Sequence, residues 1–392
     1  MRSLRILQVL EDYSDLGGIP EVVENLAGEL KQVGHQVQVA STRHRDGDRQ
    51  EIRRRSDVEL SYITLPNSKP SWSLRHLERL IREPIQARAG EFARMLSRWR
   101  PDIVHSHVWR WDKYPLLVNT CEVARVPIVH TMYHPAPWGE GRLGSRAVLC
   151  LGRARMLAAI SSASRDFFAR IIPEALQARV VIGGVDAAAI AATPAHPRKR
   201  PYVFCASRLL LANKAIDVLI AAFKIAAAKF PDIDLLISGI GPDRARVQEL
   251  IAANQLESRV RLLGLVSRER LYALHRGAAV FAMPSRGRGE GLGLVFLEAM
   301  AAGVPIIGTA SGGPSEIIVD HFNGLLIEEE NVKGLGDALC SLLSDPDARK
   351  QMGERGRTMV EAKYTWRRFA EHYDEIYSDC LAGAPLSRSV SR

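Results

Sequence analysis

Long apolar runs and closely spaced cysteine pairs are missing from this chain, and a signal peptide is not expected. No apolar stretch approaches the length of a membrane span. The amino end, MRSLRILQVLEDYSD, reaches acidic residues after a short apolar strand, so it lacks the longer apolar region of a signal peptide. The five cysteines stand far apart without a Cys-x-x-Cys pair, which argues against a zinc site or a disulfide framework. We therefore expect a globular protein of the cytoplasm.

Acidic residues are also fewer than basic ones. The formal net charge is +9 and the pI is near 9.5, which favours an anionic partner. Charge alone admits a nucleotide, an anionic lipid surface or nucleic acid. The chain has 392 residues, and at about 150 residues per domain this length predicts two or three domains.

The first half of the chain alternates short apolar strands with helical patterns. Residues 4–10 predict a strand, Gly17 and Gly18 a turn, residues 19–33 a helix and residues 36–40 a second strand. This order opens a parallel α/β sheet, in which ligands lie near the carboxyl ends of the strands. The Gly-Gly turn does not match G-x-G-x-x-G, so a dinucleotide cofactor is not indicated.

The most informative stretch runs from Met283 to Pro305, where a glycine-rich loop joins a strand to a helix. Such a turn offers free backbone N–H groups and the positive end of a helix dipole, which suit a phosphate. Glu290 and Glu298 frame this turn, and carboxylates beside a phosphate site are expected to accept hydrogen bonds from sugar or ribose hydroxyls. The competing interpretation is that both acids are solvated surface residues.

Two cations follow the first predicted strand of the second half. Arg208 comes after the strand at residues 202–206, and Lys214 is predicted in the first turn of the next helix. Two fixed cations beside a helix dipole can bind a diphosphate, although unpaired surface cations are the alternative. Gly239 and Gly241 end a further strand, where glycine permits close backbone approach to a ligand.

The string EGLGLVFLEAMAAGVPII, with its Glu-x7-Glu spacing, resembles the signature of retaining GT-B glycosyltransferases of glycosyltransferase family 4. The resemblance implies an α/β fold of GT-B type, with two Rossmann-like, doubly wound parallel-sheet domains facing a cleft. It spans nearly the whole chain. The implied organisation is an acceptor-side domain at 1–186, a linker at 187–200, a nucleotide-sugar domain at 201–363, a helix at 364–381 that crosses back to the first domain, and a disordered tail at 382–392.

The same resemblance assigns roles to residues of this sequence. It implies that Arg208 and Lys214 bind the donor diphosphate, that Glu290 lies by the donor sugar and that Glu298 lies by the ribose. A histidine of the family lies beside the donor sugar; His134 is the first choice here, with His130 and His107 as substitutes. The remaining donor contacts are expected at Gly17, Gly18, Gly239, Gly241, Val266, Gly291, Leu292 and Gly293. Gly183 stands where the family has an asparagine.

Three Asp-x-Asp pairs could suggest a metal, because such pairs hold a divalent cation in the other large glycosyltransferase fold. One sits among arginines, one follows Phe230-Pro231 just before a strand, and one begins a helix. We therefore expect no metal and no other cofactor. The pairs are Asp46/Asp48, Asp232/Asp234 and Asp345/Asp347.

The resemblance thus implies a retaining, metal-independent transferase that moves a sugar from a nucleotide-diphosphate sugar to a hydroxyl acceptor, in glycan, polysaccharide or glycolipid synthesis. A nucleotide-sugar epimerase or hydrolase of the same fold is the alternative, followed by a non-catalytic basic binding protein. The arginine-rich segment at 72–99 could lie on the anionic inner face of a membrane or be an ordinary surface helix. Nucleic acid is not an expected partner.

Overall fold

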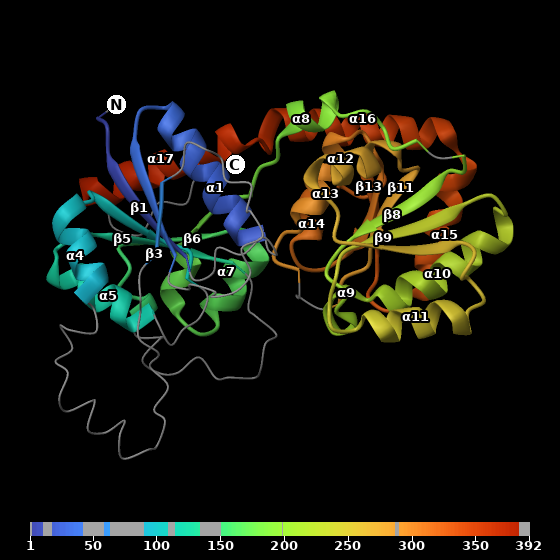
Figure 1. Cartoon of the computed structure of the whole chain (residues 1–392), viewed down its shortest axis with the longest axis horizontal. Coiled ribbons are helices and arrows are strands. Elements are labelled where there is room, and N and C mark those ends of the chain that lie inside the picture. The colour runs from blue at the N-terminus through green and yellow to red at the C-terminus, as the bar shows by residue number, and fades with distance from the viewer. Residues whose placement is uncertain are drawn as a thin grey trace, which may run out of the picture. The chain divides into compact units, whose positions relative to one another are not determined.

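The structure, a computed structural model, describes residues 2–10, 18–41, 59–62, 90–108, 114–133, 150–197, 199–286 and 290–383. The chain divides into two compact units, one made of Met1–Val181 with Phe369–Arg392 and the other of Ile182–Arg368. Each unit contains a parallel sheet with helices on both faces (Figure 1). No helix in the described part of the chain is long and apolar enough to cross a membrane.

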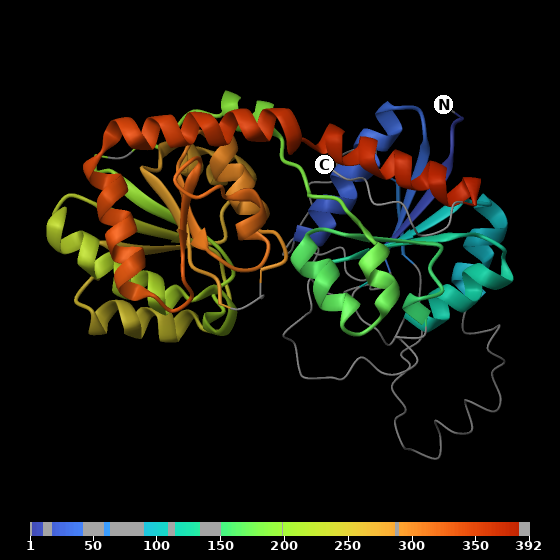
Figure 2. The ribbon, with the colours of Figure 1, turned by 180° about the vertical axis from the view of Figure 1, so that it is seen from behind.

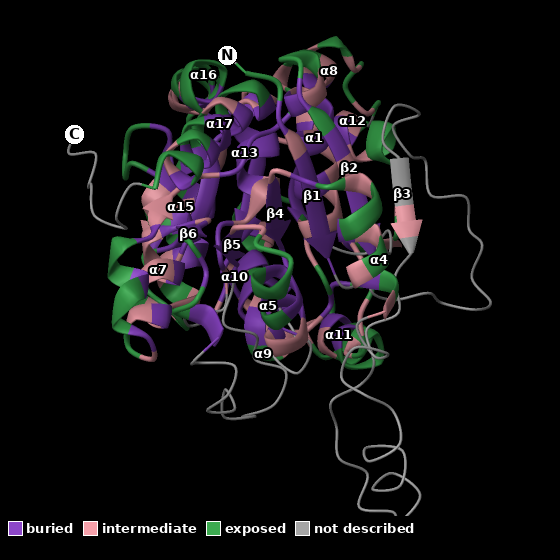
Figure 3. Cartoon of the chain, turned by 90° about the vertical axis from the view of Figure 1, so that its left-hand side faces the viewer, coloured by how far each residue is buried: buried purple, intermediate pink, exposed green. Residues whose placement is uncertain are grey.

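The sheet of the first unit has the order β3-β2-β1-β4-β5-β6-β7 over the described residues, and neighbouring strands are parallel. The order in which the chain adds strands to the sheet reverses between β1 and β4. Strands β1 to β3 extend the sheet to one side, and β4 to β7 extend it to the other. Figure 3 shows β1, β4 and β5 as largely buried, as expected for strands covered on both faces. The strands are β1 (Arg5–Leu10), β2 (Gln36–Ser41), β3 (Glu59–Tyr62), β4 (Ile103–Ser106), β5 (Ile128–Met132), β6 (Met156–Ala159) and β7 (Arg179–Val180).

Helices cover both faces of this first sheet. On one face lies a core that includes Phe92, Tyr114 and Phe168 from three helices. The opposite face is covered by α1, which buries Val22, Val23, Leu26 and Leu30 at helical spacing. The helices are α1 (Gly18–Gln32), α4 (Gly90–Trp99), α5 (Tyr114–Val123), α7 (Ser162–Ala169) and the short 3₁₀ helix η1 (Pro173–Gln177).

The second unit has a parallel sheet of order β10-β9-β8-β11-β12-β13, which reverses direction between β8 and β11. Its strands are β8 (Tyr202–Ala206), β9 (Asp234–Ser238), β10 (Val260–Gly264), β11 (Val280–Met283), β12 (Ile306–Thr309) and β13 (Gly324–Ile327). Its helices are α8 (Ala187–Ala192), α9 (Leu211–Lys214), α10 (Ile216–Lys229), α11 (Arg244–Ala253), α12 (Arg268–Gly277), α13 (Leu294–Ala301), α14 (Pro314–Ile317), α15 (Val332–Ser344) and α16 (Pro346–Lys363).

The predicted fold class of two doubly wound parallel sheets is confirmed, and two local predictions need correction. Residues 187–200 do not begin as a linker, because 187–192 form α8, which buries Ile190 and contacts α12 and α13. Lys214 is not in the first turn of a long helix either. It ends the four-residue α9, and Ala215, with φ of 45°, separates α9 from α10.

The last described helix, α17 (Trp366–Ala382), belongs to the first unit from Phe369 onward. Figure 2 shows it in red, running over the first sheet. Its buried tyrosines continue a hydrogen-bond chain that starts on the sheet. His105 on β4 bonds through Nδ1 to the Tyr377 hydroxyl and through Nε2 to the Thr131 hydroxyl, each at 2.7 Å. The Thr131 oxygen also lies 2.7 Å from the Tyr373 hydroxyl.

This hydrogen-bond chain predicts that the Thr131 hydroxyl stabilises the first unit. Thr131→Val keeps the shape of the side chain but leaves His105 Nε2 and the Tyr373 hydroxyl without this partner. Unpaired buried groups cost about 1–3 kcal/mol each, so we expect a loss of about 2–4 kcal/mol in the free energy of unfolding, measured in urea. Thr131→Ser retains the hydroxyl and should cost about 1 kcal/mol for the lost methyl group. Equal stability of Thr131→Val and the native protein would contradict this role.

Candidate functional site

The candidate site lies in the second unit, where the sheet order reverses. In a doubly wound sheet the loops beyond the carboxyl ends of the strands on either side of this reversal form the ligand crevice. Here those loops follow β8 and β11. The loop after β8 leads into α9, and the loop after β11 is the glycine-rich segment that enters α13.

Two of the predicted residues are brought together directly. Lys214, at the end of α9, forms an ion pair through Nζ with Oε2 of Glu290 in the glycine-rich loop. The two side chains are 19% and 13% exposed, so the pair is mostly withdrawn from solvent and weakly screened. Residues 76 positions apart in sequence therefore meet at one point of the crevice edge. In the described structure this lysine and this glutamate, for which separate roles were predicted, form one ion pair.

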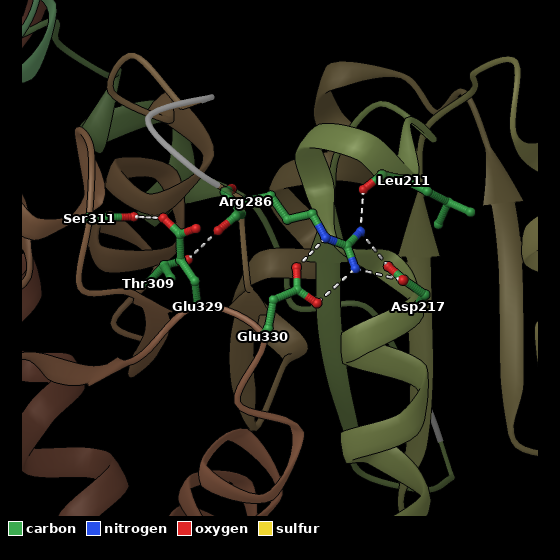
Figure 4. Close-up of polar contacts among 8 residues, drawn as sticks. Leu211, Asp217, Arg286, Thr309, Ser311, Glu329 and Glu330 are labelled. Atoms are coloured by element: carbon green, nitrogen blue, oxygen red, sulfur yellow. Dashed lines mark hydrogen bonds and ion pairs between the residues drawn. The ribbon is translucent and has the colours of Figure 1, made fainter.

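Arg286, which the sequence analysis did not single out, holds the surrounding loops in place (Figure 4). Its guanidinium makes a bidentate contact with Asp217 at 2.8 and 2.7 Å and donates to the Leu211 carbonyl at 2.5 Å. It also contacts both carboxylate oxygens of Glu330. The backbone N–H of Arg286 donates to the carbonyl of Asn213 at 2.8 Å. One residue thus fixes both ends of the turn that carries Lys214.

The charges of this cluster reinforce one another. The hydrogen bonds that Arg286 donates to Asp217 and Glu330 raise the pKa of Arg286 above its ordinary value. Burial raises the pKa of Asp217, but the hydrogen bonds and charge of Arg286 outweigh this effect and leave that pKa below its usual value. Both groups therefore stay charged at neutral pH, and the α9 turn is held by an ionised bidentate pair.

Glu298 does not join the Lys214 pair, and its carboxylate faces the interior of the second unit. The residue is 4% exposed, and its Oε2 lies 3.4 Å from Nε2 of His275 on α12. His275 is fully buried and was not predicted as a site residue. It lies near the end of α12, a helix rich in charged residues, and no local sequence feature marked it.

The predicted glycines serve close packing within the second unit. A Cβ on Gly239, whose φ is +135°, would lie 1.9 Å from the Ser207 carbonyl oxygen. A Cβ on Gly241 would lie 2.2 Å from the Leu209 carbonyl oxygen. These contacts bring the loops after β8 and β9 together and account for both glycines without a ligand. They also place the loop after β8, which carries Arg208, beside the loop after β9.

The loop before α13 is packed in the same way. Gly313 donates its N–H to the Glu290 carbonyl at 3.0 Å, and its missing Cβ would meet the Gly291 carbonyl oxygen at 2.3 Å. Gly293 has φ of +80° and begins α13 without a side-chain cap, while Leu292 is buried. The first N–H groups of this helix therefore have no side-chain acceptor at the N-cap, which leaves the positive end of α13 available for an anion.

The remaining residues predicted to bind the donor lie beyond the carboxyl ends of β8 and β10. Arg208 is exposed in the loop after β8, and Val266 is half-buried beyond β10. Sequence reasoning missed two exposed apolar side chains nearby in the fold: Ile240, 40% exposed, follows β9, and Leu265, 57% exposed, follows the neighbouring β10. Two apolar side chains at adjoining strand ends suit a planar, apolar face such as that of a nucleobase.

Gly183 stands where the resembled family has an asparagine. A Cβ at this position would lie 2.9 Å from Cδ2 of Leu294, so the first residue of α13 fills the space that a longer side chain would need. Asp46 and Asp48 lie outside the described residues, and one aspartate of each of the other two Asp-x-Asp pairs has a structural contact. Asp234 is buried near Arg259 at 3.6 Å, and the Asp345 side chain caps α16 by accepting from the Ala348 N–H at 2.9 Å.

The described residues include only some of the site residues predicted in the first unit. Gly17 and His134 lie outside the described residues, and Gly18 begins α1. His107 and His130, the substitutes for His134, are buried, and the His107 Nδ1 lies 2.7 Å from the Tyr133 hydroxyl. Burial lowers the pKa of each of these two histidines to about 3. Both rings are therefore neutral at physiological pH.

The two doubly wound parallel sheets have the arrangement of the GT-B class of glycosyltransferases. Residues 186–359 match the family described as "Glycosyl transferases group 1", and residues 17–184 match the "Glycosyl transferase 4-like domain". The protein belongs to the glycosyltransferase family that these two models describe, as its Glu290/Glu298 spacing had indicated.

Relatives among characterised proteins include two mannosyltransferases. The GDP-mannose-dependent monoacylated alpha-(1-6)-phosphatidylinositol monomannoside mannosyltransferase of Corynebacterium glutamicum is 38% identical over 181 residues, which cover 45% of this chain and only 46% of that relative. The GDP-mannose-dependent alpha-(1-6)-phosphatidylinositol monomannoside mannosyltransferase of Mycolicibacterium smegmatis is 32% identical over 270 residues, covering 65% of this chain and 70% of that relative.

Solved structures agree on the fold. HepE of Anabaena in complex with UDP-glucose has a TM-score of 0.79 at 17% sequence identity, covering 96% of this chain and 100% of that one. At this level of identity the likeness concerns the fold alone.

The buried histidines predict how stability depends on pH. An unfolded histidine has a pKa of about 6.5, so below this pH the unfolded chain binds protons that buried His107 and His130 do not. Stability should therefore fall as the pH drops from about 6.5 towards 3, by about 1.4 kcal/mol per pH unit for each such histidine. In urea unfolding at pH 7, 6 and 5, His130→Phe should have a shallower pH slope by about one proton.

A matched control removes a buried aromatic ring that has no titratable nitrogen. Phe168 is 2% exposed, so Phe168→Leu should lower stability but leave the pH slope as in the native protein. An unchanged slope in His130→Phe would show that this ring is protonated in the folded protein and would overturn the assignment of a neutral buried histidine.

Proposed function

We propose that the protein is a retaining glycosyltransferase that moves a sugar from a nucleotide-diphosphate sugar to a hydroxyl acceptor without a resident metal ion. The observation that carries this proposal is the Lys214–Glu290 ion pair, which joins the α9 turn to the glycine-rich loop in a protein of the glycosyltransferase family. The pair supplies a cation for the leaving diphosphate and a carboxylate for a sugar hydroxyl at one point of the crevice edge.

The reaction would proceed on one face of the sugar. The acceptor hydroxyl attacks the anomeric carbon from the side on which the diphosphate leaves, and its proton passes to a phosphate oxygen. The bond between the anomeric carbon and the phosphate oxygen breaks, and the departing diphosphate takes the electron pair. Lys214, Arg208 and the N-terminus of α13 would stabilise the developing negative charge, so no separate protein base is required.

The same groups suggest how the donor is oriented. Ile240 and Leu265 would contact the nucleobase, Glu298 would accept a hydrogen bond from the ribose, and Glu290 would meet the sugar. Because the two mannosyltransferase relatives are named as GDP-mannose-dependent, GDP is the first nucleotide to test, followed by UDP. Their names also make a lipid-linked glycan the first acceptor class to test.

A thermal-shift screen with GDP, UDP and ADP, each with EDTA or magnesium, tests the donor site. At about 100 times Kd, a nucleotide that binds the folded state should add roughly 2.7 kcal/mol of stability. We expect one diphosphate to stabilise the protein equally with EDTA and with magnesium, and Arg208→Ala to lose the effect. Stabilisation by none of the nucleotides would refute the proposed donor site, and stabilisation only with magnesium would refute the metal-independent mechanism.

The role of Lys214 can be separated from general charge loss. Lys214→Ala should lower kcat for sugar transfer by roughly 10²–10³-fold, the usual effect of removing one group that stabilises transition-state charge. Lys333→Ala removes the same charge from an exposed pair with Asp337 on α15 and should leave kcat unchanged. Full activity of Lys214→Ala, or rapid release of free sugar without any acceptor, would contradict the assignment.

A further inference from the structure

Glu298 and His275 form a close contact between two buried titratable side chains of the second unit. Glu298 on α13 is 4% exposed and His275 on α12 is fully buried, with 3.4 Å between Oε2 and Nε2. Glu298 Oε2 and both ring nitrogens of His275 lack a hydrogen bond in the described structure. A buried carboxylate without a hydrogen-bond donor is costly, so a group that donates a hydrogen bond to Glu298 would be stabilising here.

The position of the His275 ring is fixed by aromatic neighbours. Its centroid lies 5.0 Å from that of Phe204 on β8 and 5.2 Å from that of Phe281 on β11. Between these two rings the imidazole has little freedom to turn away from α13. Only a protonated Nε2 can face the Glu298 carboxylate favourably, because the lone pair of an unprotonated nitrogen would repel it. The packing therefore places the Nε2 edge of the ring opposite Oε2, at 3.4 Å.

We propose that His275 is a positioning residue for Glu298. By occupying Oε2 from the interior, it orients the carboxylate so that Oε1 accepts a hydrogen bond from a hydroxyl of the nucleotide ribose. His275 itself does not touch the ligand; it acts through Glu298 and determines how strongly the site prefers a ribose over a deoxyribose. This inference rests on the proposed function, in which Glu298 meets the ribose.

A merely structural histidine would behave differently. Its loss would lower stability through the packing against Phe204 and Phe281 but would leave the preference for ribose unchanged. A positioning role predicts a loss of that preference, because a Glu298 carboxylate without the imidazole behind it can turn away from the ligand, which weakens its bond to a ligand hydroxyl. The ratio of affinities for a nucleotide and its deoxy analogue therefore distinguishes the two roles.

The experiment measures Kd by calorimetry for the nucleoside diphosphate that stabilises the native protein, and for its 2′-deoxy and 3′-deoxy analogues. We expect the native protein to prefer the ribonucleotide over at least one analogue by about tenfold, which corresponds to one hydrogen bond to a charged group. His275→Phe retains an aromatic ring between Phe204 and Phe281 and should lose most of this preference. His275→Gln, which places an amide N–H near the original Nε2, should restore it.

Two further variants keep the test decisive. In a Glu298→Gln background, His275→Phe should have no additional effect on the ribose preference, since the carboxylate through which it acts is gone. Tyr202→Phe removes a hydrogen bond to the Leu274 carbonyl beside His275 and should lower the Tm without changing the preference. If the phenylalanine variant does not fold, His275→Leu is measured in its place.

The outcomes separate this inference from the proposed function. If His275→Phe lowers the Tm but keeps the native preference, the residue is structural and the inference is overturned while the donor site stands. If the native protein binds the nucleotide but has no preference for ribose, Glu298 does not meet the sugar; this overturns the inference and the proposed ribose contact while the rest of the donor site stands. If no nucleoside diphosphate binds the native protein, both conclusions fail together.

Discussion

The charge of Arg286 is the constraint on which the geometry of the candidate site depends. A guanidinium that is partly withdrawn from water needs anionic partners, and Asp217 and Glu330 supply them from α10 and from the segment after β13. The guanidinium also donates to the Leu211 carbonyl, and the backbone N–H of Arg286 donates to the Asn213 carbonyl. The Asn213 carbonyl, which a continuous helix would bond to an N–H four residues later, is thus engaged by Arg286, and α9 and α10 remain separate helices. The position of Lys214 follows from that interruption, and with it the meeting with Glu290.

The two units use buried polar groups in opposite ways. In the second unit two ion pairs, Lys214 with Glu290 and Arg286 with Asp217, hold charged side chains in partly buried positions at the candidate site, where the low dielectric strengthens their interaction with a charged ligand. In the first unit, burial lowers the pKa of His105 and His107 and so keeps both rings neutral. His105 then serves as a donor and acceptor between the sheet and α17. A histidine just beyond a parallel strand therefore need not be a ligand contact, even where the sheet topology favours one.

Most of the architecture could be predicted from the sequence, because apolar strands, glycine turns and amphipathic helices alternate with clear periodicity. The Glu290/Glu298 spacing also led correctly to the family. What periodicity could not provide were partners distant in sequence. Arg286 appeared to be one of several loop cations, and nothing local marked Asp217, 69 residues earlier, as its partner. His275 read as the end of a polar helix, and the break at Ala215 depends on tertiary contacts that override helix propensity.

The membership of α17 in the first unit has a consequence for how the protein is made. Tyr373 and Tyr377, which bond to Thr131 and His105 on the first sheet, lie almost two hundred residues after the strand at 179–180. During synthesis His105 and Thr131 therefore lack these partners until the second unit has emerged from the ribosome. The amino-terminal unit can be completed only after that point, and a nascent chain halted before residue 369 would hold a complete second unit and an incomplete first one.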